Sequence, residues 1–245
     1  MITALEEFSL NAWAALQTVH YDGWVLRFAN GYTKRANSIN PIHASSIPLD
    51  EKIRFCEEIY KSRQLPVVFK LTPHVYPEML DEELSARGFQ KSPSSTSVQT
   101  LKLDFSNFHL PLQTELEESL SSAWLNAVCH MNGVAEENRE TLRQILLNVV
   151  PHHCFLSLKS DDRIVACGMG VLQSEFLGLF DIVTDPAFRN RGYGRQVVEG
   201  LLAWGQQNQA KQAYLQVELH NTVALHLYSS LGFKEQYQYW YRSKP

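Results

Sequence analysis

The chain has 245 residues, which is enough for one large domain or two small ones with a real hydrophobic core. Apolar residues make up 44% and charged residues 20% of it, as in an ordinary folded domain. Its net charge of −4 argues against non-specific binding to nucleic acid, which requires a basic surface. It has no apolar run of membrane-spanning length and no signal-peptide pattern at its start, so we expect a cytoplasmic protein without a membrane segment.

The N-terminal half alternates helix-like and strand-like patterns. A helix is expected at Leu5–Ala15, and the strands Trp24–Ala29 and Tyr32–Ile39 are expected to form a hairpin around Asn30-Gly31, a typical turn sequence. The segments that follow are a helix Asp50–Arg63, a buried strand Pro66–Leu71, a helix Tyr76–Ala86 ending before Gly88, a polar loop Gln90–Ser97 and a strand Val98–Leu103.

Phe105–Pro111 is expected to connect the two halves, and the second half again alternates between helix and strand. Its expected helices are Leu112–Met131, Ala135–Val149, Gln196–Gln207 and Thr222–Ser230. Its expected strands are Cys154–Leu158 and Ile164–Leu172, which form a hairpin, followed by Phe176–Thr184, Ala213–Leu219 and Phe233–Arg242.

The two halves echo one another. Each contains a helix, a strand and a second helix, and then a Gly-Phe pair that precedes a strand: Gly88-Phe89 in the first half and Gly232-Phe233 in the second. The echo favours a tandem arrangement of two α/β units. Helix–Gly–Phe–strand punctuation is also common in unrelated proteins, so the pattern by itself does not require duplication.

The segment Asp185–Arg195 joins an apolar strand to a helix and carries two glycines and three arginines. Glycine lets the backbone approach an anion closely, the start of a helix offers free N–H groups, and arginine adds charge and donors. The segment is therefore suited to a phosphate. It is not a dinucleotide-binding fingerprint, because Val197 stands where the third glycine belongs, and the chain has no Gly-Lys-Ser/Thr of a Walker loop.

The pattern Arg189-x-x-Gly192-x-Gly194 resembles the acyl-CoA pyrophosphate loop of the GCN5-related N-acetyltransferases (GNAT). The stretch from Leu215 to Phe233 is similar to the other signature of that family, in which an Asn caps a helix that carries a Tyr and ends in Leu-Gly-Phe. The spacing resembles the enzymes that acetylate the amino termini of ribosomal proteins. The resemblance covers about residues 113–242 and implies a mixed α/β GNAT fold in two tandem halves.

The resemblance implies an acetyl-CoA-dependent N-acetyltransferase that acts on a primary amine. Asn221 would contact the pantetheine arm and Tyr228 would protonate the departing thiolate, whereas each could also be structural, as a helix cap and a core aromatic residue. The backbone of Ile182 and Val183 would pair with the pantetheine amides. The residues implied to hold the pyrophosphate are Arg189, Asn190, Arg191, Gly192, Tyr193, Gly194 and Arg195.

The general base departs from the family's pattern. Ribosomal-protein acetyltransferases place a Glu where this chain has Gln216, and histone-type enzymes place one near Gly178. The remaining candidates are Asp181 and Glu218, with His220 as a weaker third. Several family members rely on water, so an enzyme remains the leading hypothesis. The alternatives are a non-catalytic acyl-CoA sensor and a transferase of a longer acyl group.

We therefore expect a degenerate N-terminal domain over 1–104 and a catalytic domain over 112–245. The first half lacks the loop motif and has Leu84 at the position of Tyr228. If 32–39 is a strand, then Thr33, Arg35 and Asn37 share one face and meet either a ligand or solvent. No metal is expected, because neither the histidines nor the four cysteines have metal-ligand spacing, and the cysteines are expected to be buried thiols. The sequence names neither the acceptor amine nor the oligomeric state.

Overall fold

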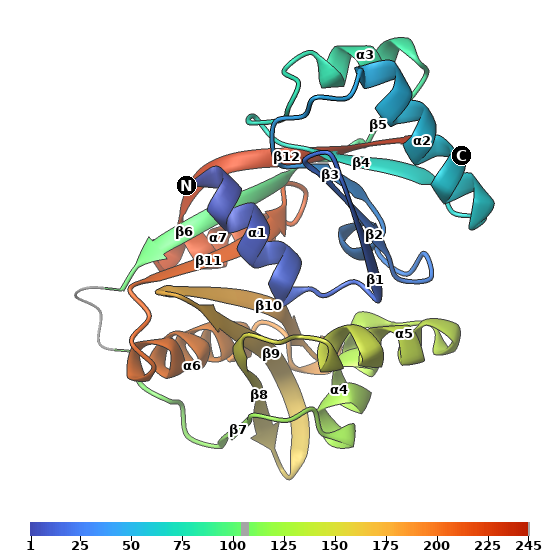
Figure 1. Cartoon of the computed structure of the whole chain (residues 1–245). Helices are drawn as coiled ribbons and strands as arrows, with labels where there is room; N and C mark the ends of the chain where they lie inside the picture. Colours follow the sequence, from blue (N-terminus) through green and yellow to red (C-terminus); the bar gives the residue numbers. More distant parts are fainter. Residues whose placement is uncertain (104–107, 245) are drawn as a thin grey trace. The chain divides into compact units, whose positions relative to one another are not determined.

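A computed structural model describes residues 1–103 and 108–244, and Figure 1 shows its helices and strands. The chain divides into two compact units that are not continuous in sequence. Unit 1 consists of Met1–Val98, Val217–Thr222 and Glu235–Pro245, and unit 2 consists of Gln99–Gln216 and Val223–Lys234. Elements near these boundaries, such as β6 (Thr96–Lys102), contribute residues to both units. The predicted domain limits at 104 and 112 stay a prediction, and residues 105–107 of the predicted connection lie outside the described residues.

Unit 1 contains a mixed sheet in the order β1-β2-β3-β4-β12, with the short β5 beside β12. The pairs are antiparallel except β3–β4, which is parallel. Its strands are β1 (Gln17–Tyr21), β2 (Trp24–Phe28), β3 (Ile39–Pro41), β4 (Val67–Leu71), β5 (Gln90–Lys91) and β12 (Lys234–Lys244). Its helices are α1 (Ile2–Ala12), the short 3₁₀ turn η1 (Lys34–Ala36), α2 (Leu49–Ser62) and α3 (Leu80–Ala86).

The predicted hairpin around Asn30-Gly31 is wrong. The hairpin joins β1 to β2 around Asp22 and Gly23, whose φ angles of 43° and 81° suit a tight turn. Gly23 is required there, because a Cβ atom on it would lie 2.4 Å from the Ala44 carbonyl oxygen. Residues 32–38 form no strand, so the predicted alternation of side chains along them does not occur.

Asn37 explains the irregular path of that segment. It is buried, accepts the N–H groups of Ala29 and Gly31 at 2.7 and 2.9 Å, and donates to the carbonyl oxygens of Ala29 and Thr33. The side chain thereby satisfies backbone groups that a strand ladder would otherwise satisfy. Arg35 lies outside any ladder too, with its guanidinium carbon 4.3 Å from the ring centroid of Trp13.

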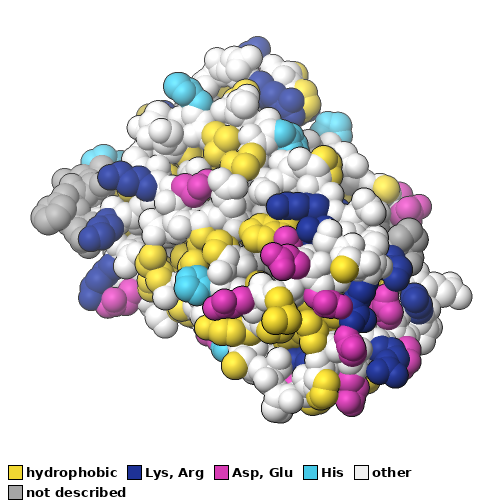
Figure 2. Space-filling view, turned by 90° about the horizontal axis from the view of Figure 1, so that it is seen from above, with side chains coloured by type: hydrophobic (Ala, Val, Ile, Leu, Met, Phe, Trp, Pro, Cys, Tyr) yellow, Lys and Arg dark blue, Asp and Glu magenta, His cyan; other side chains and the backbone are white. Residues whose placement is uncertain are grey.

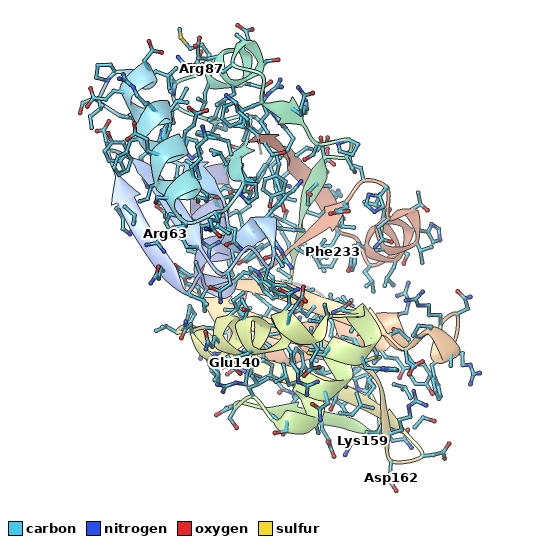
Figure 3. The ribbon with its side chains drawn as sticks, turned by 90° about the vertical axis from the view of Figure 1, so that its right-hand side faces the viewer. Arg63, Arg87, Glu140, Lys159, Asp162 and Phe233 are labelled. Carbon is cyan, nitrogen blue, oxygen red and sulfur yellow. The ribbon has the colours of Figure 1, made fainter. Side chains whose placement is uncertain are left out.

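Unit 2 contains a second mixed sheet in the order β11-β10-β9-β8-β7, in which only β10–β11 is parallel. Its strands are β7 (Thr114–Glu117), β8 (His152–Ser160), β9 (Arg163–Gln173), β10 (Phe176–Thr184) and β11 (Gln212–Glu218). Its helices are α4 (Ser122–Asn132), α5 (Glu136–Leu147), the 3₁₀ turn η2 (Pro186–Phe188), α6 (Tyr193–Gln207) and α7 (Thr222–Ser230). Lys159 and Asp162 lie near the tip of the β8–β9 hairpin (Figure 3).

Helices α6 and α4 cover opposite faces of the β8–β10 sheet (Figure 1). On one face, a Cβ atom at Gly168 would lie 2.7 Å from the side chain of Val197, so α6 lies very close to β9. On the other face, Trp124 of α4 packs on Phe155 with ring centroids 4.9 Å apart. The structure corrects the predicted helix 112–131, because its first part is the edge strand β7, which pairs with β8.

Candidate functional site

The predicted phosphate loop lies between β10 and α6 in unit 2. Its first residue, Asp185, is 4% exposed and accepts the Ala187 N–H at 2.9 Å, which begins η2. Arg163 of β9 donates to the same carboxylate, and the Asp185 N–H donates to the Val165 carbonyl at 2.9 Å. The start of the loop is therefore fixed to β9 on both its side chain and its backbone.

Helix α6 begins with free donors. Gly192 precedes it with a φ of 82°, a left-handed conformation that favours glycine. The first helical bond runs from the Gln196 N–H to the Gly192 carbonyl at 3.1 Å. This leaves the N–H groups of Tyr193, Gly194 and Arg195 without partners inside the helix, and no hydrogen bond from a side chain caps the helix start within residues 1–103 and 108–244. An anion is the natural partner for such a helix start.

Two exposed arginines border this helix start. Within the described part of the chain, neither Arg189 nor Arg191 forms an ion pair, and the guanidinium carbon of Arg191 lies 5.1 Å from the ring centroid of Phe188. Arg195 differs from them, because its Nη1 lies 3.2 Å from Oε1 of Glu199. The arrangement provides two cations that are ready for an anionic ligand and one that is already engaged. Asn190, which lies between the two free cations, has a positive φ of 61°.

Helix α7 contacts the same loop. Arg195 donates to Oγ of Ser230 at 2.5 Å. A Cβ atom at Gly194 would lie 3.6 Å from Oγ1 of Thr184 and 3.7 Å from Cδ2 of Leu227. The end of β10, the start of α6 and the second half of α7 therefore meet. The distances at Gly194 are ordinary van der Waals contacts, so the protein itself does not require glycine there.

Strand β10 stops pairing with β11 before β10 itself ends. The register pairs Phe176–Leu179 with Gln212–Leu215 of β11, although β10 continues to Thr184. On its other side, the ladder to β9 shifts before Val183, and Asp181 and Ile182 form a bulge. The end of β10 thus offers backbone groups outside the β11 ladder.

Asp181 stands in this bulge with a φ of 48°, which is rare for a residue with a side chain. Burial, and after it the Asp181 carboxylate, raise the pKa of the Cys167 thiol. Burial raises the pKa of the Cys129 thiol on α4; Arg139 of α5 lowers it, and Glu136 and the Asp181 carboxylate raise it. The Asp181 carboxylate is thus near enough to both thiols to act on their pKa.

Tyr228 is buried in α7, with 7% of its surface exposed, and its ring packs edge-on against Phe233 at 5.9 Å. Phe233, labelled in Figure 3, follows α7. Burial raises the pKa of the Tyr228 hydroxyl to about 12. The phenol therefore keeps its proton at neutral pH and is able to act as a donor.

The remaining predicted residues surround the start of α7. Asn221 directly precedes the helix and is exposed. Glu218, at the end of β11, lies 3.1 Å from the Nε2 atom of His220, and both side chains are more than half exposed. Gln216 is half-buried in the same strand. Glu218 is thus a solvent-facing carboxylate, whereas Asp181 is half-buried.

Two anchors of the site carry no signal in the local sequence. Arg163 fixes Asp185, and Ser230 fixes Arg195, yet both come from elements distant from the loop. An arginine at the start of a predicted strand and a serine at the end of a predicted helix are ordinary surface residues. Only the tertiary fold identifies them as supports of the loop.

Among the described residues, no three His, Cys, Asp or Glu side chains are placed to hold a metal ion, and no helix is long and apolar enough to cross a membrane. The four cysteines are buried thiols, as predicted. On the face that Figure 2 shows, Lys and Arg side chains are interspersed with Asp and Glu. This face therefore carries charges of both signs.

Known proteins match this chain over almost its whole length. The model of the family described as "Probable histone acetyltransferase Rv0428c C-terminal" matches residues 1–242. The "Uncharacterized N-acetyltransferase YobR" of Bacillus subtilis is 26% identical over 246 residues, which cover 99% of this chain and 98% of that protein. The [ribosomal protein bS18]-alanine N-acetyltransferase of Salmonella typhimurium is 36% identical over 80 residues, 33% of this chain and 54% of that protein.

Solved structures share the fold. A GCN5-related N-acetyltransferase from Kribbella flavida aligns with a TM-score of 0.73 and 13% identity over 99% of this chain and 95% of its own. A tandem GNAT protein from the clavulanic acid biosynthesis pathway aligns with a TM-score of 0.66 and 9% identity over 98% of this chain and 87% of its own. At these identities the likeness is one of fold, and it confirms the predicted fold.

Proposed function

Because the chain belongs to the family of GCN5-related N-acetyltransferases, we propose that it transfers an acetyl group from acetyl-CoA directly to a primary amine. The observation that supports this most strongly is the uncapped start of α6 beside Arg189 and Arg191. Three backbone N–H groups and two guanidinium groups that form no ion pair with the described residues suit a pyrophosphate. The protein itself would tolerate a Cβ at Gly194, so a glycine there is consistent with the close approach of a ligand.

The end of β10 is the proposed place for the pantetheine arm. The backbone of Ile182 and Val183 lies where β10 no longer pairs with β11, and so it is suited to bind amide groups. Asn221, at the start of α7, is the proposed further contact. Acetyl-CoA would supply the acetyl group as an activated thioester; the protein would orient it and exclude water.

Tyr228 is the proposed general acid. Its raised pKa keeps the proton on the hydroxyl until a more basic group forms nearby, and a departing thiolate is such a group. Its burial on α7, the helix that also contacts the α6 loop, supports this role.

Asp181 is the favoured general base. It lies in the strained bulge where β10 leaves the ladder, and strained positions of this kind are frequent at functional sites. Glu218, exposed and already paired with His220, is the second candidate. Either carboxylate would take the proton of the attacking amine directly or through water.

We further propose that residues 112–245 form the catalytic domain and that residues 1–104 form a degenerate domain of the same fold. Phe233 donates its N–H to the Tyr228 carbonyl at 3.0 Å, and Phe89 makes the same bond to Leu84. The equivalent helix ends support a common origin of the halves, and Leu84 lacks the hydroxyl that Tyr228 has.

The test is CoA release by the purified chain with acetyl-CoA and a panel of primary amines, and mass spectrometry of the products. We expect acetylation of at least one amine class and its loss in a variant with both Arg189 and Arg191 changed to Ala. Binding of acetyl-CoA without any turnover would indicate the non-catalytic sensor instead. Stronger thermal stabilisation by longer acyl-CoAs than by acetyl-CoA would indicate a different acyl donor.

A further inference from the structure

A carboxylate joins the β1–β2 turn of unit 1 to the loop that follows β3. Asp22, in the turn, accepts the N–H groups of Ser46 and Ile47, each at 2.8 Å from its Oδ2, and the Ser46 hydroxyl at 3.0 Å from its Oδ1. The bond from Ile47 is the largest influence on the pKa of the Asp22 carboxyl and lowers it to about 2. Because Asp22 and Ser46 lie 24 residues apart, this is a tertiary contact and not a local turn motif.

Lys52 of α2 supplies a cation to the same carboxylate. Its Nζ lies 3.3 Å from Oδ2 of Asp22, and its side chain is only 1% exposed. The ammonium also donates to the Asp22 carbonyl oxygen and lies 4.1 Å from the ring centroid of Trp24. A buried cation of this kind depends strongly on its partner charge. The Asp22 carboxylate is therefore held by backbone N–H groups, a hydroxyl and an ammonium, which are the groups that bind an anionic ligand.

The loop that Asp22 fills has the same place in unit 1 as the proposed pyrophosphate loop has in unit 2. Two antiparallel strand pairs are followed by a parallel pair in both units, along β1-β2-β3-β4 and along β8-β9-β10-β11. In each unit the loop leads from the third of these strands to a helix, α2 or α6, that precedes the fourth. The first backbone contact of the loop is also repeated, because His43 donates its N–H to the Gly23 carbonyl at 3.0 Å, as Asp185 does to Val165 at 2.9 Å.

The two loops differ in the charges that meet there. In unit 2 the second strand supplies a cation, Arg163, to the acid of the loop, Asp185, and no side-chain hydrogen bond from the described residues caps the start of α6. In unit 1 the turn supplies the acid itself, and the segment 42–48 contains neither glycine nor arginine. Asp50 and Glu51 lie in the first turn of α2, where their charge disfavours an external phosphate.

We propose that Asp22 is an internal ligand, whose carboxylate occupies in unit 1 the place that the pyrophosphate of acetyl-CoA takes in unit 2. The second half of this comparison rests on the proposed function. Since Ser46, Ile47 and Lys52 already bind Asp22, unit 1 offers these donors to no incoming phosphate. The chain therefore binds one molecule of acetyl-CoA, and the anion site of unit 1 serves to fix the β1–β2 turn to the loop before α2.

The first experiment replaces the internal carboxylate by a free one. Asp22→Gly removes the side chain and suits the φ of 43° at this position, and acetate supplies the carbon and carboxylate atoms that are lost. We expect the midpoint of thermal unfolding of the whole chain to fall by roughly 5–10 °C, because Lys52 loses its partner. Acetate at about 100 mM should restore at least half of this loss. A variant that folds only when acetate is present would support the proposal equally.

Three comparisons make the rescue specific. Sodium chloride at the same concentration should restore nothing. Asp162→Gly, at another turn position with a positive φ of 60° (Figure 3), should cost less stability and should not respond to acetate. Asp22→Asn keeps a side chain in the site, so acetate has no room and should not rescue this variant. A loss without rescue in Asp22→Gly, or the same response to acetate in all three variants, overturns the proposal.

Hydrogen exchange shows where the acetate binds. The amides of Ser46 and Ile47 should exchange at least about tenfold faster in Asp22→Gly than in the unchanged chain, and acetate should slow them again. Equal exchange rates at these two amides in the variant and in the unchanged chain overturn the proposal.

The second experiment counts the molecules of acetyl-CoA bound per chain by calorimetric titration. We expect one site, which is lost in the variant with both Arg189 and Arg191 changed to Ala. A second site per chain overturns the proposal. A chain that binds no acetyl-CoA at all contradicts the proposed function instead. The rescue by acetate uses no acetyl-CoA, so it decides the role of Asp22 in either case.

Discussion

The ring of Tyr214 fills the space that a side chain at Gly178 would need. A Cβ atom on Gly178 would lie 2.7 Å from the Tyr214 hydroxyl oxygen and 2.5 Å from the Phe180 ring. The two rings pack edge-on, 6.0 Å apart. Position 178 therefore has no room for the Glu that histone-type acetyltransferases place near it. The pairing of Gly178 with Tyr214 in the β10–β11 ladder explains why glycine stands there.

The first prediction follows from this packing. Gly178→Ala should destabilise the fold by about 1–3 kcal/mol, because both neighbours are rings in a closed core. Urea unfolding measures the loss. Gly194→Ala is the matched control, since its nearest neighbours are 3.6 and 3.7 Å away. Equal midpoints for the two variants would contradict the packing argument.

The second prediction concerns ligand binding at Gly194. Gly194→Ala should leave the free energy of unfolding within about 0.5 kcal/mol of the unchanged chain. It should nevertheless raise the dissociation constant of acetyl-CoA by about tenfold, because the added methyl group lies at the start of α6, where the backbone must approach the ligand. Calorimetric titration measures the constant. A variant that binds normally would show that the pyrophosphate lies elsewhere.

The third prediction concerns the two arginines without ion pairs. Arg189→Ala and Arg191→Ala should each weaken acetyl-CoA binding by ~10–100-fold, the usual range for a hydrogen bond to a charged group. The loss should shrink as salt is added, because these side chains are exposed. Arg143→Ala serves as the control, since Arg143 is an exposed arginine of α5 paired with Glu140. A loss of the same size in Arg143→Ala would rule out a specific contact.

The fourth prediction concerns Tyr228. Tyr228→Phe should lower kcat by about 100-fold and leave the KM for acetyl-CoA nearly unchanged, because only the proton donor is removed. An ordinary phenol deprotonates near pH 10, but burial raises this pKa to about 12. The acid form is lost only above the raised pKa, so kcat should not fall between neutral pH and about pH 10 on account of this group. A decline there that Tyr228→Phe abolishes would contradict the raised pKa, and an unchanged kcat in Tyr228→Phe would contradict the assignment of the acid.

The fifth prediction separates the two candidate bases. Asp181→Asn should lower kcat/KM by about 10²–10⁴-fold, whereas Glu218→Gln should leave it nearly unchanged. Steady-state kinetics with acetyl-CoA and an accepted amine measure the difference. The opposite result would transfer the role to Glu218, and an unchanged kcat/KM in both variants would point to water.

The sequence predicted those elements best whose ends carry clear local signals. The bounds of β10 and α7 are confirmed residue for residue, because Asp185-Pro186 ends the first, and Asn221 and Gly232 border the second. The end of α6 at Gln207 is also confirmed, but the helix begins at Tyr193, three residues before the expected Gln196. These signals act between residues that are near in sequence.

The failures have a tertiary cause. Asp22-Gly23 and Asn30-Gly31 are equally good turn sequences. The first joins β1 to β2, whereas next to the second the buried side chain of Asn37 takes up the N–H groups of Ala29 and Gly31. Strand β7 was predicted as helix because its pairing with β8 joins residues far apart in the chain. For the same reason no local pattern could show that Ser230 anchors Arg195.

The position of β12 has a consequence for synthesis on the ribosome. It pairs with β4 in unit 1, Arg242 bonds to Asp81 at 2.6 Å, and Tyr237 bonds to Glu6. The N-terminal residues leave the ribosome first, yet their sheet lacks this strand until residues 235–244 emerge. Unit 1 is therefore translated early and completed late, so its exposed β4 edge must remain soluble, or be protected by a chaperone, while unit 2 is being made.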